Sequence, residues 1–117
     1  MKKSIAAAIC LASASVGTAT HAETILGPYG SDQCSRLVDN KELDLTSGAI
    51  VWAFGYLSAL SVSADGLAGA ESKLSKALGN VSYSALADKI RFECEKNRSL
   101  EFWVVVSKVA NKLANSK

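Results

Sequence analysis

Apolar residues recur three and four positions apart along most of the chain beyond residue 30, and this spacing is typical of amphipathic helices. It predicts helices over residues 31–41, 46–66, 67–78, 82–96 and 99–114. Gly79 and Asn80 end the third helix, while Pro28, the only proline, leaves the rest of the chain free to form helices. The pattern therefore predicts an all-α fold, a small bundle of four to five helices in one domain over residues 23–117.

The first and last helices have recognisable start signals. Ser31 and Ser99 are expected to be N-caps, because a serine hydroxyl accepts a hydrogen bond from a free backbone N–H of the first turn. The three consecutive valines at 104–106 favour a strand. We still expect a helix there, because apolar residues continue at helical spacing. They are Trp103, Val106, Ala110 and Leu113.

Residues 45–64 allow two interpretations, because they contain no charged side chain over a length that can span a membrane. Gly55 and Ala59 also form a small-xxx-small pair, which occurs at interfaces between membrane helices. Five Ser and Thr side chains make the segment less hydrophobic than a lipid-facing helix and favour a core helix over a membrane span. The side chains expected to pack into the core on that interpretation are Trp52, Tyr56 and Leu60.

Residues 1–22 are typical of a cleaved secretory signal peptide. Two lysines precede an uncharged stretch that is rich in Ala and Ile and shorter than the roughly 20 residues of a membrane span. Small residues then lead to Ala22. We expect cleavage after Ala22, with a weaker site after Ala14, and we expect the mature chain in the periplasm.

Cleavage would discard Cys10 and leave Cys34 and Cys94 in an oxidising compartment. An even number of cysteines in a short exported chain predicts a disulfide, and two cysteines have only one intramolecular pairing. On the chain-entropy model, a crosslink that closes a loop of this length stabilises the fold by about 4 kcal/mol. The predicted bundle is therefore closed by a Cys34–Cys94 bond.

Charge is unevenly distributed along the predicted mature chain. Loss of Lys2 and Lys3 lowers the 13 basic residues to 11, equal to the 11 acidic residues. Residues 23–71 hold seven acids and two bases, whereas residues 89–117 hold seven bases and three acids. Either these regions pair within the fold or in a dimer, or one of them is a docking surface for a charged partner. Protonation of the carboxylates at acid pH would make the chain strongly positive and loosen it by repulsion.

The predicted mature chain contains no histidine, because His21 lies in the signal peptide. It therefore has no Ser-His or Cys-His pair for catalysis and no His-containing zinc site. We expect a protein that is not an enzyme and that needs no metal and no cofactor. The candidate partner-binding residues are the aromatic side chains of the two strongest predicted helices: Trp52, Phe54, Tyr56, Phe102 and Trp103.

The order of these features resembles the HdeA/HdeB group of small periplasmic proteins, the acid-stress chaperones. The resemblance rests on the signal peptide, an early Cys34, the segment WAFGYLS at 52–58, the segment CEKN at 94–97 and a final amphipathic helix. The WxxGYLS helix and the two-cysteine frame are also similar to Rap1a/Tai-type immunity proteins of the type VI secretion system.

The first resemblance implies an all-helical fold with Cys34 and Cys94 as the disulfide pair, a dimer at neutral pH, and apolar helix faces that bind unfolding clients in acid. The second implies a binding module that neutralises a secreted toxin. Protein clients or one protein partner are therefore expected, while nucleic-acid binding and membrane insertion are not.

Overall fold

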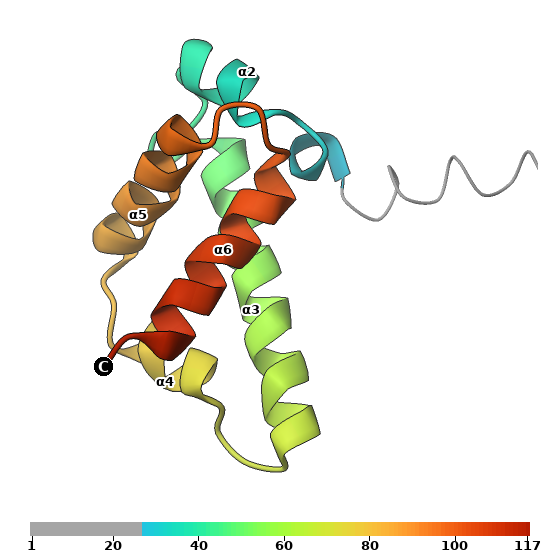
Figure 1. The fold of residues 1–117 in the computed structure, drawn as a ribbon, viewed down its shortest axis with the longest axis vertical. Helices are drawn as coiled ribbons and strands as arrows, with labels where there is room; N and C mark the ends of the chain where they lie inside the picture. Colours follow the sequence, from blue (N-terminus) through green and yellow to red (C-terminus); the bar gives the residue numbers. More distant parts are fainter. Residues whose placement is uncertain (1–26) are drawn as a thin grey trace, which may run out of the picture.

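Five α-helices and a preceding helical turn make up residues 27–117, the part of the chain that this computed structural model describes (Figure 1). The turn covers residues 27–30. The helices are α2 (Cys34–Asp39), α3 (Gly48–Ala68), α4 (Lys73–Gly79), α5 (Tyr83–Lys96) and α6 (Phe102–Asn115). No strand occurs within residues 27–117, so the predicted all-α bundle is confirmed. The predicted signal peptide and its cleavage site lie outside the described residues.

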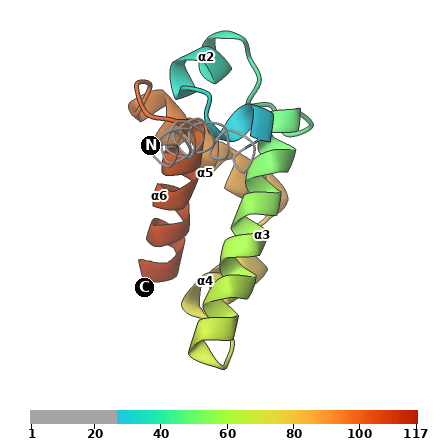
Figure 2. The ribbon, with the colours of Figure 1, turned by 90° about the vertical axis from the view of Figure 1, so that its right-hand side faces the viewer.

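Helix α6 is the centre of the packing, because it contacts α3, α4 and α5, while α2 covers α5 (Figures 1 and 2). Its buried side chains include Phe102, Val105, Val106 and Val109, spaced three and four apart on one face. The three consecutive valines are helical, as expected. Two of them lie in the core with no exposed surface, so burial outweighs their intrinsic preference for strand.

Helix α3 presents a different face to the core from the one expected. Its buried residues include Ile50, Ala53 and Leu57, whereas Trp52 and Tyr56 are only half-buried at the flank of the core. The expectation that Trp52, Tyr56 and Leu60 provide the main core contacts of this helix is therefore wrong. Ala53 has no exposed surface and lies on the core side of α3, whereas the rings of Trp52 and Tyr56 pack beside the core.

A disulfide joins Cys34, at the start of α2, to Cys94, in the last turn of α5. The two Cα atoms are 5.2 Å apart, and neither cysteine has exposed surface. The bond confirms the predicted pairing. It ties the N-terminal segment to the end of α5, next to the loop that leads into α6.

Backbone pairing beside the disulfide explains why two helices begin three residues later than their predicted N-caps. The N–H of Cys34 donates to the carbonyl of Leu100 at 2.9 Å, and the N–H of Phe102 donates to the carbonyl of Asp32 at 2.8 Å. The residues before α2 and α6 are therefore extended and paired with each other. Ser31 and Ser99 are not N-caps, because the helices begin at Cys34 and Phe102.

The other helix boundaries follow local signals. Ser47, Ser72 and Ser82 are N-caps, each accepting a hydrogen bond from the backbone N–H three residues on. Helix α3 continues to Ala68, and Gly69 ends it in the left-handed conformation at φ 66°. The third predicted helix was therefore placed about one turn and a half too early.

Candidate protein-binding surface

One side of α3 is not covered by any described part of the chain. We call this surface the outer face of α3. It carries no ionisable side chain, and its apolar members Val51 and Val62 are 56% and 70% exposed. We count with it Leu67 of the projecting last turn, which is 92% exposed although it lies further round the helix. Its other exposed members are Gly55, Ser58, Ala59, Ser63 and Gly66.

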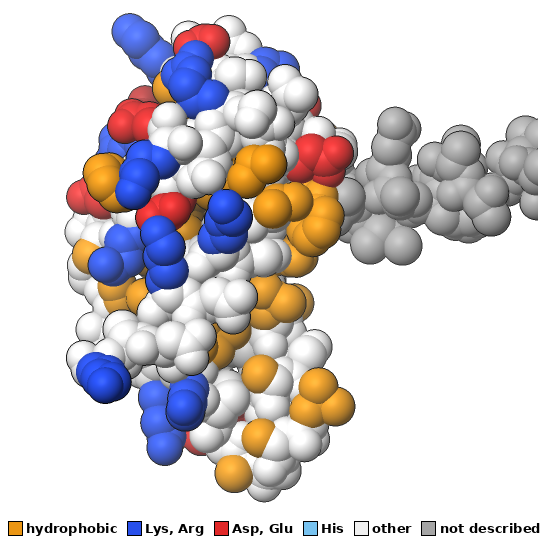
Figure 3. All heavy atoms as spheres, viewed as in Figure 1, with side chains coloured by type: hydrophobic (Ala, Val, Ile, Leu, Met, Phe, Trp, Pro, Cys, Tyr) orange, Lys and Arg blue, Asp and Glu red, His pale blue; other side chains and the backbone are white. Residues whose placement is uncertain are grey.

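The distal half of α3 projects past the C-terminal end of α6 in both ribbon views (Figures 1 and 2). Hydrophobic atoms are visible along this half in the space-filling view, at its lower right (Figure 3). Among the described helices, α3 alone has the length and mean hydropathy of a membrane span, and 22% of its most apolar window is buried. A core helix of a soluble protein passes the same test of length and composition, and the first half of α3 packs in the core.

Asp65 anchors the projecting end of α3 to α4. Its carboxylate accepts hydrogen bonds from the backbone N–H of Ser72 at 2.7 Å and from the hydroxyl of Ser75 at 2.8 Å and 2.7 Å. These hydrogen bonds, those of Ser72 first, lower the pKa of the Asp65 carboxyl below its ordinary value. The contact between α3 and α4 therefore depends on an ionised carboxylate.

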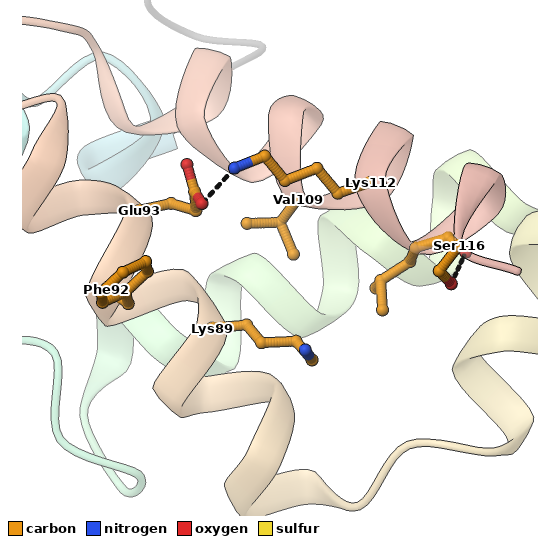
Figure 4. Close-up of a pocket in the computed structure, with 7 residues that line it drawn as sticks. Lys89, Phe92, Glu93, Val109, Lys112 and Ser116 are labelled. Carbon is orange, nitrogen blue, oxygen red and sulfur yellow. Dashed lines mark hydrogen bonds and ion pairs between the residues drawn. The ribbon is translucent and has the colours of Figure 1, made fainter.

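Glu93 provides a second carboxylate contact, between α5 and α6. Its side chain is 9% exposed and forms an ion pair with Lys112 of α6, which is 61% exposed (Figure 4). The hydrogen bond from Lys112 lowers the pKa of Glu93; burial opposes this shift, while Lys96 and Lys108 add to it. Lys112 is 19 residues from Glu93 in the sequence, and no local pattern links the two.

Three of the candidate aromatic residues form a cluster at the junction of α3 and α6. Trp52 stacks on Tyr56 with ring centres 5.1 Å apart, and it lies 5.6 Å from the ring of Phe102. The hydroxyl of Ser107 donates to the Trp103 carbonyl, so the Tyr56 hydroxyl donates its proton to Ser107 across a distance of 3.0 Å. This cluster holds the first half of α3 against α6.

The five aromatic candidates do not form one exposed surface. Phe102 has no exposed surface and Phe54 is 9% exposed, so both are core side chains in this fold. Trp52, Tyr56 and Trp103 are half-buried. The indole N–H of Trp103 donates to Glu101 at 2.6 Å. The apolar side chains that are most exposed were not singled out by the sequence, because an exposed position on a nearly uncharged helix has few charged neighbours to mark it.

No protein-family model, curated protein or solved structure matches the chain. Its class is therefore defined by the structure: a small all-α domain, closed by one disulfide, with an uncovered and uncharged helix face. Among residues 27–117, no group of His, Cys, Asp and Glu side chains is arranged to hold a metal ion.

Proposed function

We propose that this protein is a periplasmic acid-stress chaperone that binds unfolding clients through the outer face of α3 and the apolar surface beside it. The observation that carries this proposal is the uncovered, uncharged outer face, whose distal end is fixed by a single carboxylate. Apolar side chains on an uncharged helix offer non-directional contacts, which suit many different clients. The resemblance to the HdeA/HdeB group agrees with this role.

Acid would release more of this surface by protonating two carboxylates. Both Asp65 and Glu93 have lowered pKa values in the folded protein, so each stabilises the fold above its unfolded pKa, and that contribution is lost as the pH falls through its folded pKa. This places the loss below about pH 4. Protonation of Asp65 weakens the contact between α3 and α4, and protonation of Glu93 frees Lys112 from α5.

The remaining contacts would limit this opening. The Cys34–Cys94 bond does not titrate in acid, and the core around Phe102 and Val106 is apolar. The proposed active form therefore keeps α2 joined to α5, while α4 and the distal half of α3 separate and expose the apolar side chains between them. Leu74 and Leu57 are the buried residues that this movement would uncover first.

Light scattering from an aggregating client protein near pH 3 tests this proposal. The mature protein should suppress aggregation, and Val62→Ser with Leu67→Ser should weaken the suppression several-fold, because both side chains are highly exposed and contribute to binding more than to folding. Phe92→Ser, which removes an exposed side chain of α5 far from the outer face of α3, is the matched control. No suppression by the unaltered protein at this pH would refute the proposal.

A second candidate function is favoured by one observation. The outer face of α3 is already exposed in the folded chain, before any carboxylate is protonated. A permanently exposed face suits an immunity-type module that holds one toxin at neutral pH. Size-exclusion chromatography after a pulldown separates the two functions. One stable complex at pH 7 favours the module, whereas capture of many clients only in acid favours the chaperone.

A further inference from the structure

A groove with a lysine rim runs between α4, α5 and the end of α6, away from the outer face of α3. It consists of two adjoining hollows of about 320 Å³ and 800 Å³, which share Lys89, Leu113 and Ser116. Figure 4 shows the smaller hollow, with Lys89 and Phe92 on one side and Val109 on the other. We call the two hollows together the lysine groove.

The charge of the lysine groove is almost entirely positive. Lys73, Lys76, Lys89 and Lys117 line the larger hollow, and no acidic residue lines it. None of these four lysines forms an ion pair with any described residue. The one carboxylate in the smaller hollow, Glu93, is already paired with Lys112. Lys and Arg side chains predominate over this region in the space-filling view, at its lower left (Figure 3).

The arginines of the chain are used elsewhere, within the fold. Arg36 pairs with two carboxylates near α2, Arg98 pairs with Asp39, and Arg91 pairs with a carboxylate of its own helix. Arginine suits fixed, two-pronged recognition of one carboxylate or phosphate, whereas lysine is a mobile point charge. A groove whose larger hollow is lined by four unpaired lysines therefore fits a partner with several carboxylates spread along its length.

Between its lysines the groove has apolar side chains, together with the polar Asn80, Asn115 and Ser116 in the larger hollow. Val81, Ala77 and Leu113 line it in the larger hollow, and Val109 and Phe92 line it in the smaller one. Phe92 is 57% exposed, and Lys96 lies over its ring at 5.0 Å from the centre. An apolar floor between charged rims is the pattern that binds an amphipathic helix, with apolar anchors on one side and charged residues beside them.

We propose that the lysine groove binds an acidic amphipathic helical segment of a partner protein at neutral pH. The charge of the rim selects carboxylates, and the floor selects an apolar stripe between them. The acidic region of a second copy fits poorly, because Asp32, Asp39 and Glu42 are already paired with Arg36 and Arg98. The groove uses α4, α5 and α6 and not the outer face of α3, so this inference does not depend on the proposed function.

Fluorescence anisotropy with a labelled peptide tests the inference. The probe is a helical peptide of about 18 residues, with Leu at every third or fourth position, Glu beside the Leu stripe and Ala elsewhere. A second peptide has the same composition in scrambled order, and a third has Lys in place of Glu. The mature protein at pH 7 should bind the first peptide, and binding should weaken as salt is added.

Matched variants of the protein locate the site. Lys76→Gln with Lys89→Gln should weaken binding roughly tenfold, since two rim charges contribute up to about a factor of five each. Lys41→Gln with Lys108→Gln removes the same charge at positions that do not line the groove and should change binding less than about twofold. Phe92→Ser should weaken binding, whereas Leu67→Ser on the outer face of α3 should not.

Three results would overturn the inference. The first is an equal loss of affinity in both double variants, which would mean that only net charge matters. The second is equal binding of the scrambled peptide. The third is binding of phosphatidylglycerol vesicles through Lys76 and Lys89 without binding of the peptide, which would assign the groove to an anionic lipid surface. None of these outcomes depends on client aggregation in acid, so failure here and failure of the chaperone proposal are separate.

Discussion

The two ends of the bundle are held together in different ways. The disulfide end comprises the turn at 27–30, α2, the loop before α6 and the first turns of α3 and α6. The α4 end comprises the distal half of α3, all of α4 and the last turns of α6. Among the described core residues, those with no exposed surface lie at the disulfide end or in the middle of α5, as Ile50, Ile90 and Phe102 show. At the α4 end, Leu74 and Leu113 keep 8% and 9% of their surface exposed.

The types of contact differ as well. The disulfide end has a covalent bond, three backbone hydrogen bonds between residues 32–35 and 98–102, an apolar core, and exposed ion pairs of Arg36 and Arg98 with carboxylates. The α4 end combines the packing of Leu74 and Leu113 with the hydrogen bonds of Asp65, which weaken when the carboxyl is protonated. This difference teaches that one small domain can combine a half that a disulfide holds at any pH with a half in which a carboxylate contributes to the packing. Four changes test the contrast, starting with the largest effect.

Loss of the disulfide should have the largest effect. Cys34→Ala with Cys94→Ala removes the crosslink between the start of α2 and the end of α5, and it should lower the free energy of unfolding by about 4 kcal/mol. Urea unfolding followed by circular dichroism measures this loss, and the reduced unaltered protein is the control. A loss below about 1 kcal/mol would mean that the disulfide end does not owe its stability to the bond.

A methyl group at Gly48 should have the second largest effect, again at the disulfide end. A Cβ there would lie 2.3 Å from the Tyr29 hydroxyl oxygen and 2.8 Å from its ring, so Gly48→Ala displaces Tyr29 or strains α3. The expected cost is about 1–2 kcal/mol, measured by thermal unfolding. Adding Tyr29→Ala should make Gly48→Ala nearly neutral, because the clash is gone. A cost that is unchanged in the Tyr29→Ala background would contradict this contact.

Replacing Glu93 should have a smaller effect that depends on pH. Glu93→Gln removes the ion pair with Lys112 and should cost about 1 kcal/mol near pH 7, since Lys112 is exposed and returns to water. The cost should disappear at low pH, because Glu93 with its lowered pKa stabilises the fold only while it is ionised. Unfolding measured as a function of pH shows this. Asp88→Asn, an exposed carboxylate on the same helix, should leave the pH profile unchanged.

Replacing Asp65 should have the smallest effect on global stability and a clear local effect. Asp65→Asn leaves a weaker acceptor for Ser72 and Ser75, so the α3–α4 connection at residues 69–72 should open more often. Limited proteolysis at pH 7 should cut this connection faster than in the unaltered protein. The connection before α6 should be cut at the same rate in both. Faster cutting at both places would mean that the two ends open together.

The sequence predicted the features that depend on local patterns. Five helices follow from the spacing of apolar residues, and the disulfide follows from the count of cysteines. The helix expected from residue 82 has Ser82 as its N-cap, because a serine before an apolar run satisfies a free N–H of the first turn. The helix signals lie within a few residues of the feature that they predict, and the disulfide needed only a count, because two cysteines allow one intramolecular pairing.

Contacts between distant segments could not be predicted from the sequence, because no local pattern marks them. The starts of α2 and α6 were misplaced because each depends on hydrogen bonds to the other segment. The core face of α3 was misjudged because packing against other helices selects Ile50, Ala53 and Leu57, while large rings such as Trp52 dominate the apolar pattern. The lysine groove collects lysines from α4, α5, α6 and the segment after α6, so the sequence shows only a general excess of basic residues.

Hydrogen–deuterium exchange at two pH values tests the contrast between the two ends most directly. Protection factors, corrected for the intrinsic exchange rate at each pH, should fall strongly in α4 and the distal half of α3 between about pH 7 and pH 3. Protection around Cys34, Cys94 and Phe102 should fall much less, because those contacts do not titrate. A uniform loss across the bundle, or full protection of α4 at the lower pH, would contradict the account.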